Sequence, residues 1–181
     1  QEAGHDLDYI AVSGALEPLG RAGQPPTPPI NVLGDFAGGA MLLAFGIVSA
    51  VLAAARTGTG QVVDAAMVDG AALLLTPFFS ARNSGFWGPR GTNHLDTGAH
   101  FYEVYECADG RWVAVGAIEP QFYAALLEGL GLTGPGVDDP EDPAEQMDPS
   151  LWPAKKERFA AVFRTRTRDE WCSLFAGRDA C

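Results

Sequence analysis

Basic residues are scarce in this sequence. Only 12 lysines and arginines stand against 23 aspartates and glutamates in 181 residues, which gives a formal net charge of −11. A protein this acidic repels the phosphate backbone of DNA and RNA, so nucleic acid is excluded as an expected partner. An anionic small molecule remains compatible with this charge, because a local arginine cluster or a helix N-terminus can bind one.

Cysteine is also scarce. Cys107, Cys172 and Cys181 are odd in number and have no CxxC spacing, which argues against a disulfide framework and a zinc site. The sequence therefore predicts no metal and a reducing, cytoplasmic location. The first residues show no basic segment followed by an apolar one, so no signal peptide is predicted.

Two further patterns are missing. "GDFAGG" lacks the GxGxxG spacing and "GTGQ" lacks the lysine of a phosphate loop, so neither predicts nucleotide binding. The longest apolar run, residues 40–55, is about 16 residues long, whereas a membrane-spanning helix needs roughly 20. The sequence predicts a helix buried in a protein core and no membrane span.

The first half reads as helices joined to short strands. Residues 9–12 and 61–63 are predicted as strands. Residues 40–55 form the long helix, which ends at Gly58, and residues 67–81 form a second apolar helix that Pro77 bends. The first half is therefore expected to be rich in helix.

The second half has a different residue pattern, with two β-rich runs followed by helices. Strands at residues 101–106 and 112–115 flank the turn pair Asp109-Gly110. A helix begins at Pro120 and ends at Gly129 or Gly131. Two amphipathic helices follow at residues 154–164 and 168–175, the second with the capping-box pair Thr167 and Glu170. A helix-rich first half thus meets a small α+β second half near residues 86–92.

Three acid–base residues stand at element boundaries. Asp35 precedes the long helix, where a carboxylate serves either as an N-cap or as a base or nucleophile. His5 stands before the first predicted strand and is either a surface or core residue or a general base. Glu119 lies at a strand-to-helix corner, where it either complements the helix dipole or faces an active site.

The remaining aromatic and histidine residues give weaker indications. Tyr102 and Tyr105 are three apart in a strand and so point to opposite faces, one to the core and one to a cleft. His94 and His100 show no partner spacing and are interpreted as structural or surface residues. A histidine, an aspartate and a glutamate in one cleft would suit proton transfer at a carbon beside a carbonyl.

Four blocks of sequence, in order, resemble a known family. "GHDLDYIAVSGAL", "PPINVLGDFAGGAM", "GQVVDAAMVDG" and "LDTGAHFYEVYECADGRWVAVGAIEPQFYAALLEGLGL" are similar to the α-methylacyl-CoA racemases of the family III CoA-transferase superfamily. The "GQVVD" and Asp35 blocks are shared with the transferases, whereas "GHD" and "AIEPQF" point to the racemase branch. His100 departs from the family pattern, in which proline is expected.

The resemblance implies a reaction and a role for each matching residue. It implies epimerisation at C2 of 2-methyl-branched acyl-CoA thioesters through an enolate. His5 would be one proton-transfer base, oriented by Glu119, and Asp35 would be the base on the opposite face of the carbon. The backbone N–H of Asp6 would donate to the thioester oxygen. Asn31 and Tyr102 would be supporting polar contacts to the substrate.

The resemblance also implies an architecture. Members have a Rossmann-like large domain, with strand, long buried helix, strand and helix, followed by a small α+β domain, and they form interlocked homodimers. For this chain the resemblance implies three segments: part of the large α/β domain at 1–85, the small α+β domain at 86–150, and linking helices at 151–181 that return toward the large domain. Against that pattern this chain would be a piece truncated at both ends, without the opening segment whose arginines contact the CoA phosphates. No separate cofactor is implied, since CoA is part of the substrate.

Two alternatives stay open. In a CoA-transferase, Asp35 would be the nucleophile and would form a mixed anhydride. The His5–Glu119 pair argues against that route, which has no evident need for it. The third alternative is an inactive folded fragment of such an enzyme, which stabilisation by CoA thioesters would distinguish from the other two.

Overall fold

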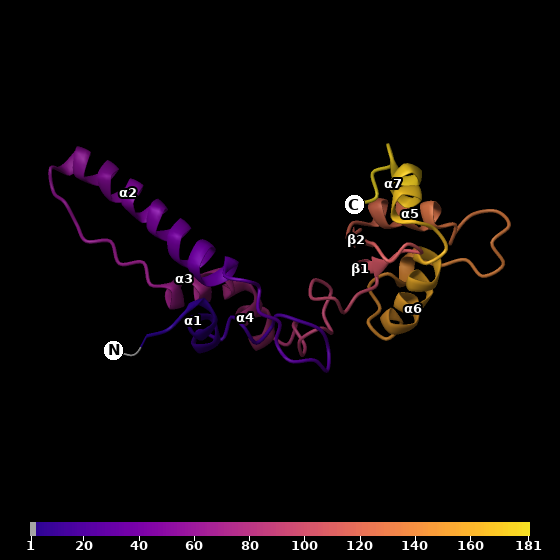
Figure 1. Cartoon of the computed structure of the whole chain (residues 1–181), viewed down its shortest axis with the longest axis horizontal. Coiled ribbons are helices and arrows are strands. Elements are labelled where there is room, and N and C mark those ends of the chain that lie inside the picture. The colour runs from indigo at the N-terminus through magenta and orange to yellow at the C-terminus, as the bar shows by residue number, and fades with distance from the viewer. Residues whose placement is uncertain (1–2) are drawn as a thin grey trace. The chain divides into compact units, whose positions relative to one another are not determined.

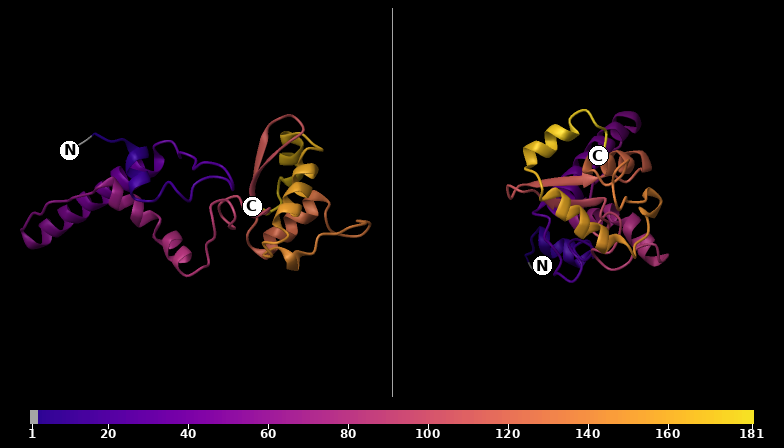
Figure 2. Two further views of the ribbon diagram at one scale, coloured as in Figure 1. Left: turned by 90° about the horizontal axis from the view of Figure 1, so that it is seen from below. Right: turned by 90° about the vertical axis from the view of Figure 1, so that its right-hand side faces the viewer.

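The computed structural model describes residues 3–181. The chain divides into two compact units on either side of the Arg90–Gly91 bond, unit 1 before it and unit 2 (Gly91–Cys181) after it. Figures 1 and 2 show the chain from three directions. Unit 1 contains α1 (Asp6–Val12), η1 (Val32–Met41), α2 (Leu42–Thr57), α3 (Met67–Leu74) and α4 (Thr76–Asn83). Unit 2 contains β1 (Tyr102–Glu106), β2 (Trp112–Gly116), α5 (Pro120–Leu130), η2 (Pro143–Glu145), α6 (Trp152–Phe163) and α7 (Arg168–Phe175).

The two strands predicted for the first half are wrong. Residues 9–12 belong to the helix α1, and residues 61–63 lie in a segment without secondary structure that pairs with no strand in the described chain. A four-residue apolar run does not by itself distinguish helix from strand. Asp6 and Ile10, four apart, are both buried on one face of α1, and Asp6 and Asp8 occupy its first turn, where carboxylates complement the helix dipole.

Unit 1 has a small core around the crossing of α1, η1 and α3. Its buried apolar residues are Ile10, Ala15, Ala71 and Leu75. The predicted helix at 67–81 is two helices, because the chain breaks at Leu75 and Pro77 lies in the first turn of α4. Figure 1 shows α1 and α3 together near the N-terminal end of α2.

A π-helix, η1, leads directly into α2. Its Gly38 meets Gly70 of α3 backbone to backbone, since a Cβ on Gly70 would lie 1.9 Å from the carbonyl oxygen of Gly38. π-Helical turns are rare and occur often at functional sites. The predicted end of α2 is confirmed: Gly58 has a φ of 73° and caps the helix in the left-handed conformation.

The helix α2 is not buried in a core as the sequence predicted. None of its residues is buried in the described chain. The continuous helix Val32–Thr57 is 26 residues long, with a hydropathy of 2.2 in its most apolar window, of which 11% is buried. By length and composition alone it could cross a membrane, so the length argument against a span does not hold. Figure 1 shows the 58–66 segment running back along α2.

Unit 2 follows the sequence prediction closely. The strands pair in antiparallel register from Tyr102 opposite Gly116 to Glu106 opposite Trp112, and Gly110 has a φ of 71° in the turn. The helix α5 begins at Pro120 and is capped by Gly131, and Thr167 with Glu170 forms the predicted capping box of α7. The strands and α5, α6 and α7 share one core that includes Phe101, Tyr123, Leu127, Phe159 and Trp171.

The α/β fold class expected from the sequence is therefore observed in part. The described part of unit 1 is helical and contains no strand, so an α/β domain cannot be read from this unit alone. Unit 2 has the mixed α and β content that was expected. The three-segment domain assignment stays a prediction, although both helices after residue 151 pack into the core of unit 2.

Candidate functional site

His5 is the N-cap residue of a helix and does not stand at the mouth of a strand, which corrects the sequence prediction. Its backbone is extended, with φ −116° and ψ 176°. Its N–H donates to Oδ2 of Asp8 at 2.9 Å, and its carbonyl oxygen accepts from the N–H of Asp8 at 3.0 Å. The backbone of His5 is thus held by the first turn of α1, while the imidazole is exposed.

The adjacent residue, Asp6, points its side chain into unit 1. Asp6 is 5% exposed. Its Oδ2 accepts hydrogen bonds from the N–H of Gly34 and the N–H of Asp35, each at 2.7 Å. Bonds this short to a carboxylate are among the stronger hydrogen bonds in proteins. They join the first turn of α1 to the first turns of η1.

Asp35 is not the N-cap of the long helix, as one of the two sequence interpretations held. It lies inside η1, whose N-cap residue is Asn31, and the Asn31 side chain makes no capping bond. Instead, Nδ2 of Asn31 donates to Oδ2 of Asp35 at 3.1 Å. The structure therefore brings Asp6, Asn31 and Asp35 together, next to His5 in the chain.

The capping role of the Asp6 carboxylate was missed by sequence reasoning, which assigned Asp6 only a backbone N–H. One signal was present. Gly34 directly precedes Asp35, and a Cβ at Gly34 would lie 2.6 Å from Oδ2 of Asp6. A glycine at this position leaves room for a side chain that approaches from elsewhere.

Glu119 and Tyr102 belong to unit 2. Glu119 is exposed at the predicted strand-to-helix corner, where it is the N-cap residue of α5 with an extended backbone and no side-chain capping bond. Tyr102 is 37% exposed and Tyr105 is 3% exposed, so the prediction that they face opposite sides of the strand is confirmed. The proposed contacts of Glu119 and Tyr102 with substrate or with His5 stay predictions.

His100 is a structural residue, in agreement with one of the two interpretations. It is fully buried, and its Nε2 lies 2.7 Å from the hydroxyl oxygen of Tyr123. Its ring packs edge-on against Phe101 and Phe159. Burial, together with the nearby charges of Lys155 and Lys156, lowers the pKa of His100 to about 3, so the ring is neutral at pH 7.

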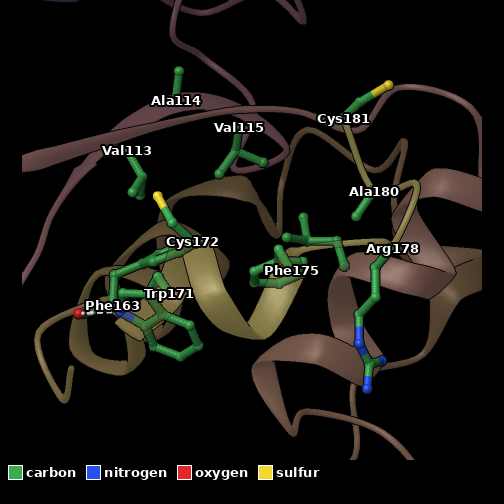
Figure 3. A pocket seen from close by; sticks show the side chains of 11 residues that line it. Val113, Ala114, Val115, Phe163, Trp171, Cys172, Phe175, Arg178, Ala180 and Cys181 are labelled. Atoms are coloured by element: carbon green, nitrogen blue, oxygen red, sulfur yellow. Dashed lines mark hydrogen bonds between the residues drawn. The ribbon is translucent and has the colours of Figure 1, made fainter. Parts of the chain in front are cut away.

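An apolar cavity of about 220 Å³ lies in unit 2, between β2 and α7. Figure 3 shows Val113 and Val115 of β2 with Trp171 and Phe175 of α7 around it, and Arg178 at one side. None of the six candidate residues lines this cavity. Among residues 3–181, no group of three histidine, cysteine, aspartate or glutamate side chains could hold a metal ion.

Comparison with known proteins places these residues in a family context. The sequence profile of CoA-transferase family III matches residues 1–181. "Alpha-methylacyl-CoA racemase" of Mus musculus is 49% identical over 180 residues, which cover 99% of this chain and 46% of that protein. The protein of the same name from Homo sapiens is 48% identical, with the same coverage. The chain thus spans about half the length of these curated relatives.

The fold likewise has a solved counterpart. The crystal structure of the hypothetical protein Rv3272 from Mycobacterium tuberculosis superposes with a TM-score of 0.71 at 23% identity. The superposition covers 97% of this chain and 46% of that one. At this identity the likeness concerns the fold alone.

Proposed function

The chain belongs to CoA-transferase family III, and from that premise we propose that the protein epimerises 2-methyl-branched acyl-CoA thioesters at C2. The proposal concerns the whole protein, because the chain spans 46% of the racemases to which it is similar. The proposal has two supports: the racemase name of these relatives, and the arrangement of His5, Asp6 and Asp35 in this structure.

The proposed reaction takes one proton from C2 and delivers another. A base removes the hydrogen on C2, and the electron pair of the broken C–H bond passes into an enolate whose negative charge lies on the thioester oxygen. A second group then returns a proton to the opposite face of the carbon, which inverts it. His5 and Asp35 are the two groups, and each exchanges its role when the reaction runs backward.

The observation that carries this proposal is the junction of α1 and η1. His5 is followed by Asp6, and the Asp6 carboxylate binds the backbone N–H of Asp35 at 2.7 Å. The backbones of the two bases are therefore held to each other by one short bridge. Two fixed acid–base groups of different chemistry are what a two-face proton transfer requires.

Other residues have supporting parts in the proposal. The N–H of Asp6, the first residue of α1, has no acceptor among the described residues and is available to the enolate oxygen. Asn31 holds the Asp35 carboxylate by donating a hydrogen bond from Nδ2. Glu119 and Tyr102 are proposed to orient the imidazole of His5 and to contact the substrate.

Several properties of the whole protein are proposed with the activity. The Rossmann-like large domain and the interlocked homodimer follow from the family resemblance, as does the absence of any cofactor besides the CoA of the substrate. A cytoplasmic location follows from the few, unpatterned cysteines. Each stays a prediction.

The test is incubation of the intact protein with a (2R)-2-methylacyl-CoA in deuterated water. We expect deuterium at C2 and formation of the (2S) epimer. If the wild-type protein gives neither deuterium at C2 nor the (2S) epimer, the proposal is disproved. A protein boiled before incubation is the control for uncatalysed exchange.

CoA transfer is the second candidate, and the family description itself favours it. Asp35 would attack the thioester carbonyl and release CoA as a thiolate, leaving a mixed anhydride. Hydroxylamine added with acyl-CoA would then convert Asp35 to a hydroxamate, detectable as a mass change of the peptide that contains it. Epimerisation without such trapping would favour the racemase proposal.

A further inference from the structure

The Asp6 side chain is engaged in a way that the proposed proton transfer does not itself require. It is almost fully buried, and one of its oxygens accepts the N–H groups of both Gly34 and Asp35 at 2.7 Å. The other oxygen, Oδ1, is buried and has no partner among the described residues. Buried carboxylates with an unused oxygen are uncommon and call for an explanation.

The two bonds cap η1 from another helix. The first N–H groups of a helix have no acceptor within it and are normally bound by the N-cap side chain. Here the N-cap residue, Asn31, instead bonds the Asp35 side chain. Asp6 supplies the missing acceptor, and its negative charge lies at the positive end of the η1 dipole.

Little space separates Gly34 from the Asp6 carboxylate and from Ile10. The Cα of Gly34 is so close to the carboxylate that a Cβ there would lie 2.6 Å from Oδ2 of Asp6. A Cβ would also lie 3.2 Å from Cγ2 of Ile10. A methyl group at Gly34 would therefore collide with the Asp6 carboxylate and press against Ile10 of the unit 1 core, so an alanine there has to displace the carboxylate.

We propose that the carboxylate of Asp6 is a positioning residue: by holding the N–H of Asp35 it sets where the Asp35 base stands relative to His5. This inference rests on the proposed function, since it assigns Asp35 the base role. It concerns the side chain of Asp6 and is separate from the role of its backbone N–H. The helix α1 thus carries one base at its N-cap and fixes the other from its first residue.

Two substitutions in the intact protein test the role of the carboxylate, one by removing its charge and one by displacing it. Asp6→Asn removes the charge but keeps the shape. Gly34→Ala keeps the charge but pushes the carboxylate off the two N–H groups. Asp69→Asn is the matched control, because Asp69 is also an acidic first-turn residue of a unit 1 helix, and its side chain is exposed and has no hydrogen bond to any residue that the structure describes.

The measurement separates the two bases. For each epimer in deuterated water, exchange with retention and inversion at C2 are followed separately. Inversion needs both bases, whereas retention exchange at the His5 face needs only His5. With Asp35 displaced by about an ångström, we expect inversion to fall about a hundredfold. Retention exchange of the epimer whose proton faces His5 should fall far less, so its ratio to inversion rises.

The double variant sharpens the assignment. In Asp6→Ala/Gly34→Ala the new methyl group meets no carboxylate, so the 2.6 Å clash is gone, and the lost cap remains together with the milder 3.2 Å contact with Cγ2 of Ile10. We expect its inversion rate to equal that of Asp6→Ala alone. Independent effects of the two residues would instead multiply and lower the rate further.

Three outcomes separate the possibilities. An unchanged ratio of retention exchange to inversion in both Asp6→Asn and Gly34→Ala overturns the positioning role, because general loss of folded protein lowers both rates together. A raised ratio in both, with Asp69→Asn unchanged, supports it. A wild-type protein with neither exchange nor inversion refutes the proposed function instead, and with it the role assigned here.

Discussion

Within the described residues, the side chain of Asp35 has one hydrogen bond, from Asn31, whereas its backbone N–H is held by Asp6. The capping contribution to stability therefore belongs to Asp6. We expect Asp35→Ala to change the free energy of unfolding by about 0.5 kcal/mol or less. Turnover should fall about 10²- to 10⁴-fold, as for loss of a general base. Chemical unfolding and epimerisation assays on one preparation check both.

A comparison with His5→Ala completes this prediction. The imidazole is exposed and the cap of α1 is made by the backbone of His5, so folding should again be little affected. A large drop in melting temperature for Asp35→Ala with normal turnover would restore the capping interpretation.

Because His100 is buried and its pKa is lowered, we expect the stability of unit 2 to depend on pH. Its pKa is lowered from 6.5 to about 3 in the folded state, so between these values the unfolded chain binds one more proton. Stability from this group is fully present above pH 6.5 and is lost as the pH falls toward 3, at about 1.4 kcal/mol per pH unit. Urea unfolding followed by tryptophan fluorescence measures the slope.

The charged and titratable groups around His100 also contribute to that slope. They are Tyr123, Lys155 and Lys156, the two lysines being paired with Glu141 and Glu103. The variant His100→Gln should therefore lose only the histidine part of the slope. His94→Gln is the control, and an identical slope in wild type and His100→Gln would contradict the prediction.

At the scale of elements, the crossing of η1 and α3 depends on glycine. A Cβ on Gly70 would lie 1.9 Å from the Gly38 carbonyl oxygen, which no side-chain rotation relieves. We expect Gly70→Ala to separate the two helices and to lower the stability of unit 1 by about 1–3 kcal/mol. Circular dichroism during urea unfolding detects it.

Gly60 is the matched control for that substitution. A Cβ on Gly60 would have no atom within 4 Å, and its backbone is not left-handed. Gly60→Ala should leave stability unchanged or raise it slightly by restricting the unfolded chain. Equal effects at the two positions would show that chain entropy, and not the helix crossing, is responsible.

At the scale of the whole molecule, the exposed helix α2 is the feature that the described chain leaves unexplained. Met41, Phe45, Val48 and Leu52 form a stripe, here called the α2 stripe, with exposed fractions between 53% and 73%. Contiguous apolar surface of this kind usually meets another protein surface or a membrane. The family resemblance favours protein, in the interlocked dimer proposed above.

This yields a test by self-association. We expect the 181-residue chain to self-associate through the α2 stripe, so that Phe45→Glu/Val48→Glu lowers its sedimentation coefficient. Val12→Glu, which changes a single exposed valine on α1, should not. Flotation of the wild-type chain with lipid vesicles, abolished by the double variant, would indicate a membrane contact instead.

The candidate site residues were chosen from short sequence motifs, and their roles stay predictions. His5, Asp35 and Glu119 were singled out by residue type at element boundaries, and their roles by resemblance to a family. The Asp6 side chain was missed because its partners lie 28 and 29 positions away, a separation at which no local pattern reveals a hydrogen bond. Which carboxylate caps η1 depends on how two helices meet.

The sequence by itself determined the elements whose ends are set by neighbouring residues: the glycine caps of α2 and α5, the Asp109-Gly110 hairpin and the Thr167 capping box. Only the tertiary structure decided that residues 6–12 are helical, that α2 lies exposed in this chain, and that Asp6 holds Asp35. Burial and long-range hydrogen bonds depend on which surfaces come together. The hydrophobic pattern of one segment reports only that it has an apolar face, not what covers it.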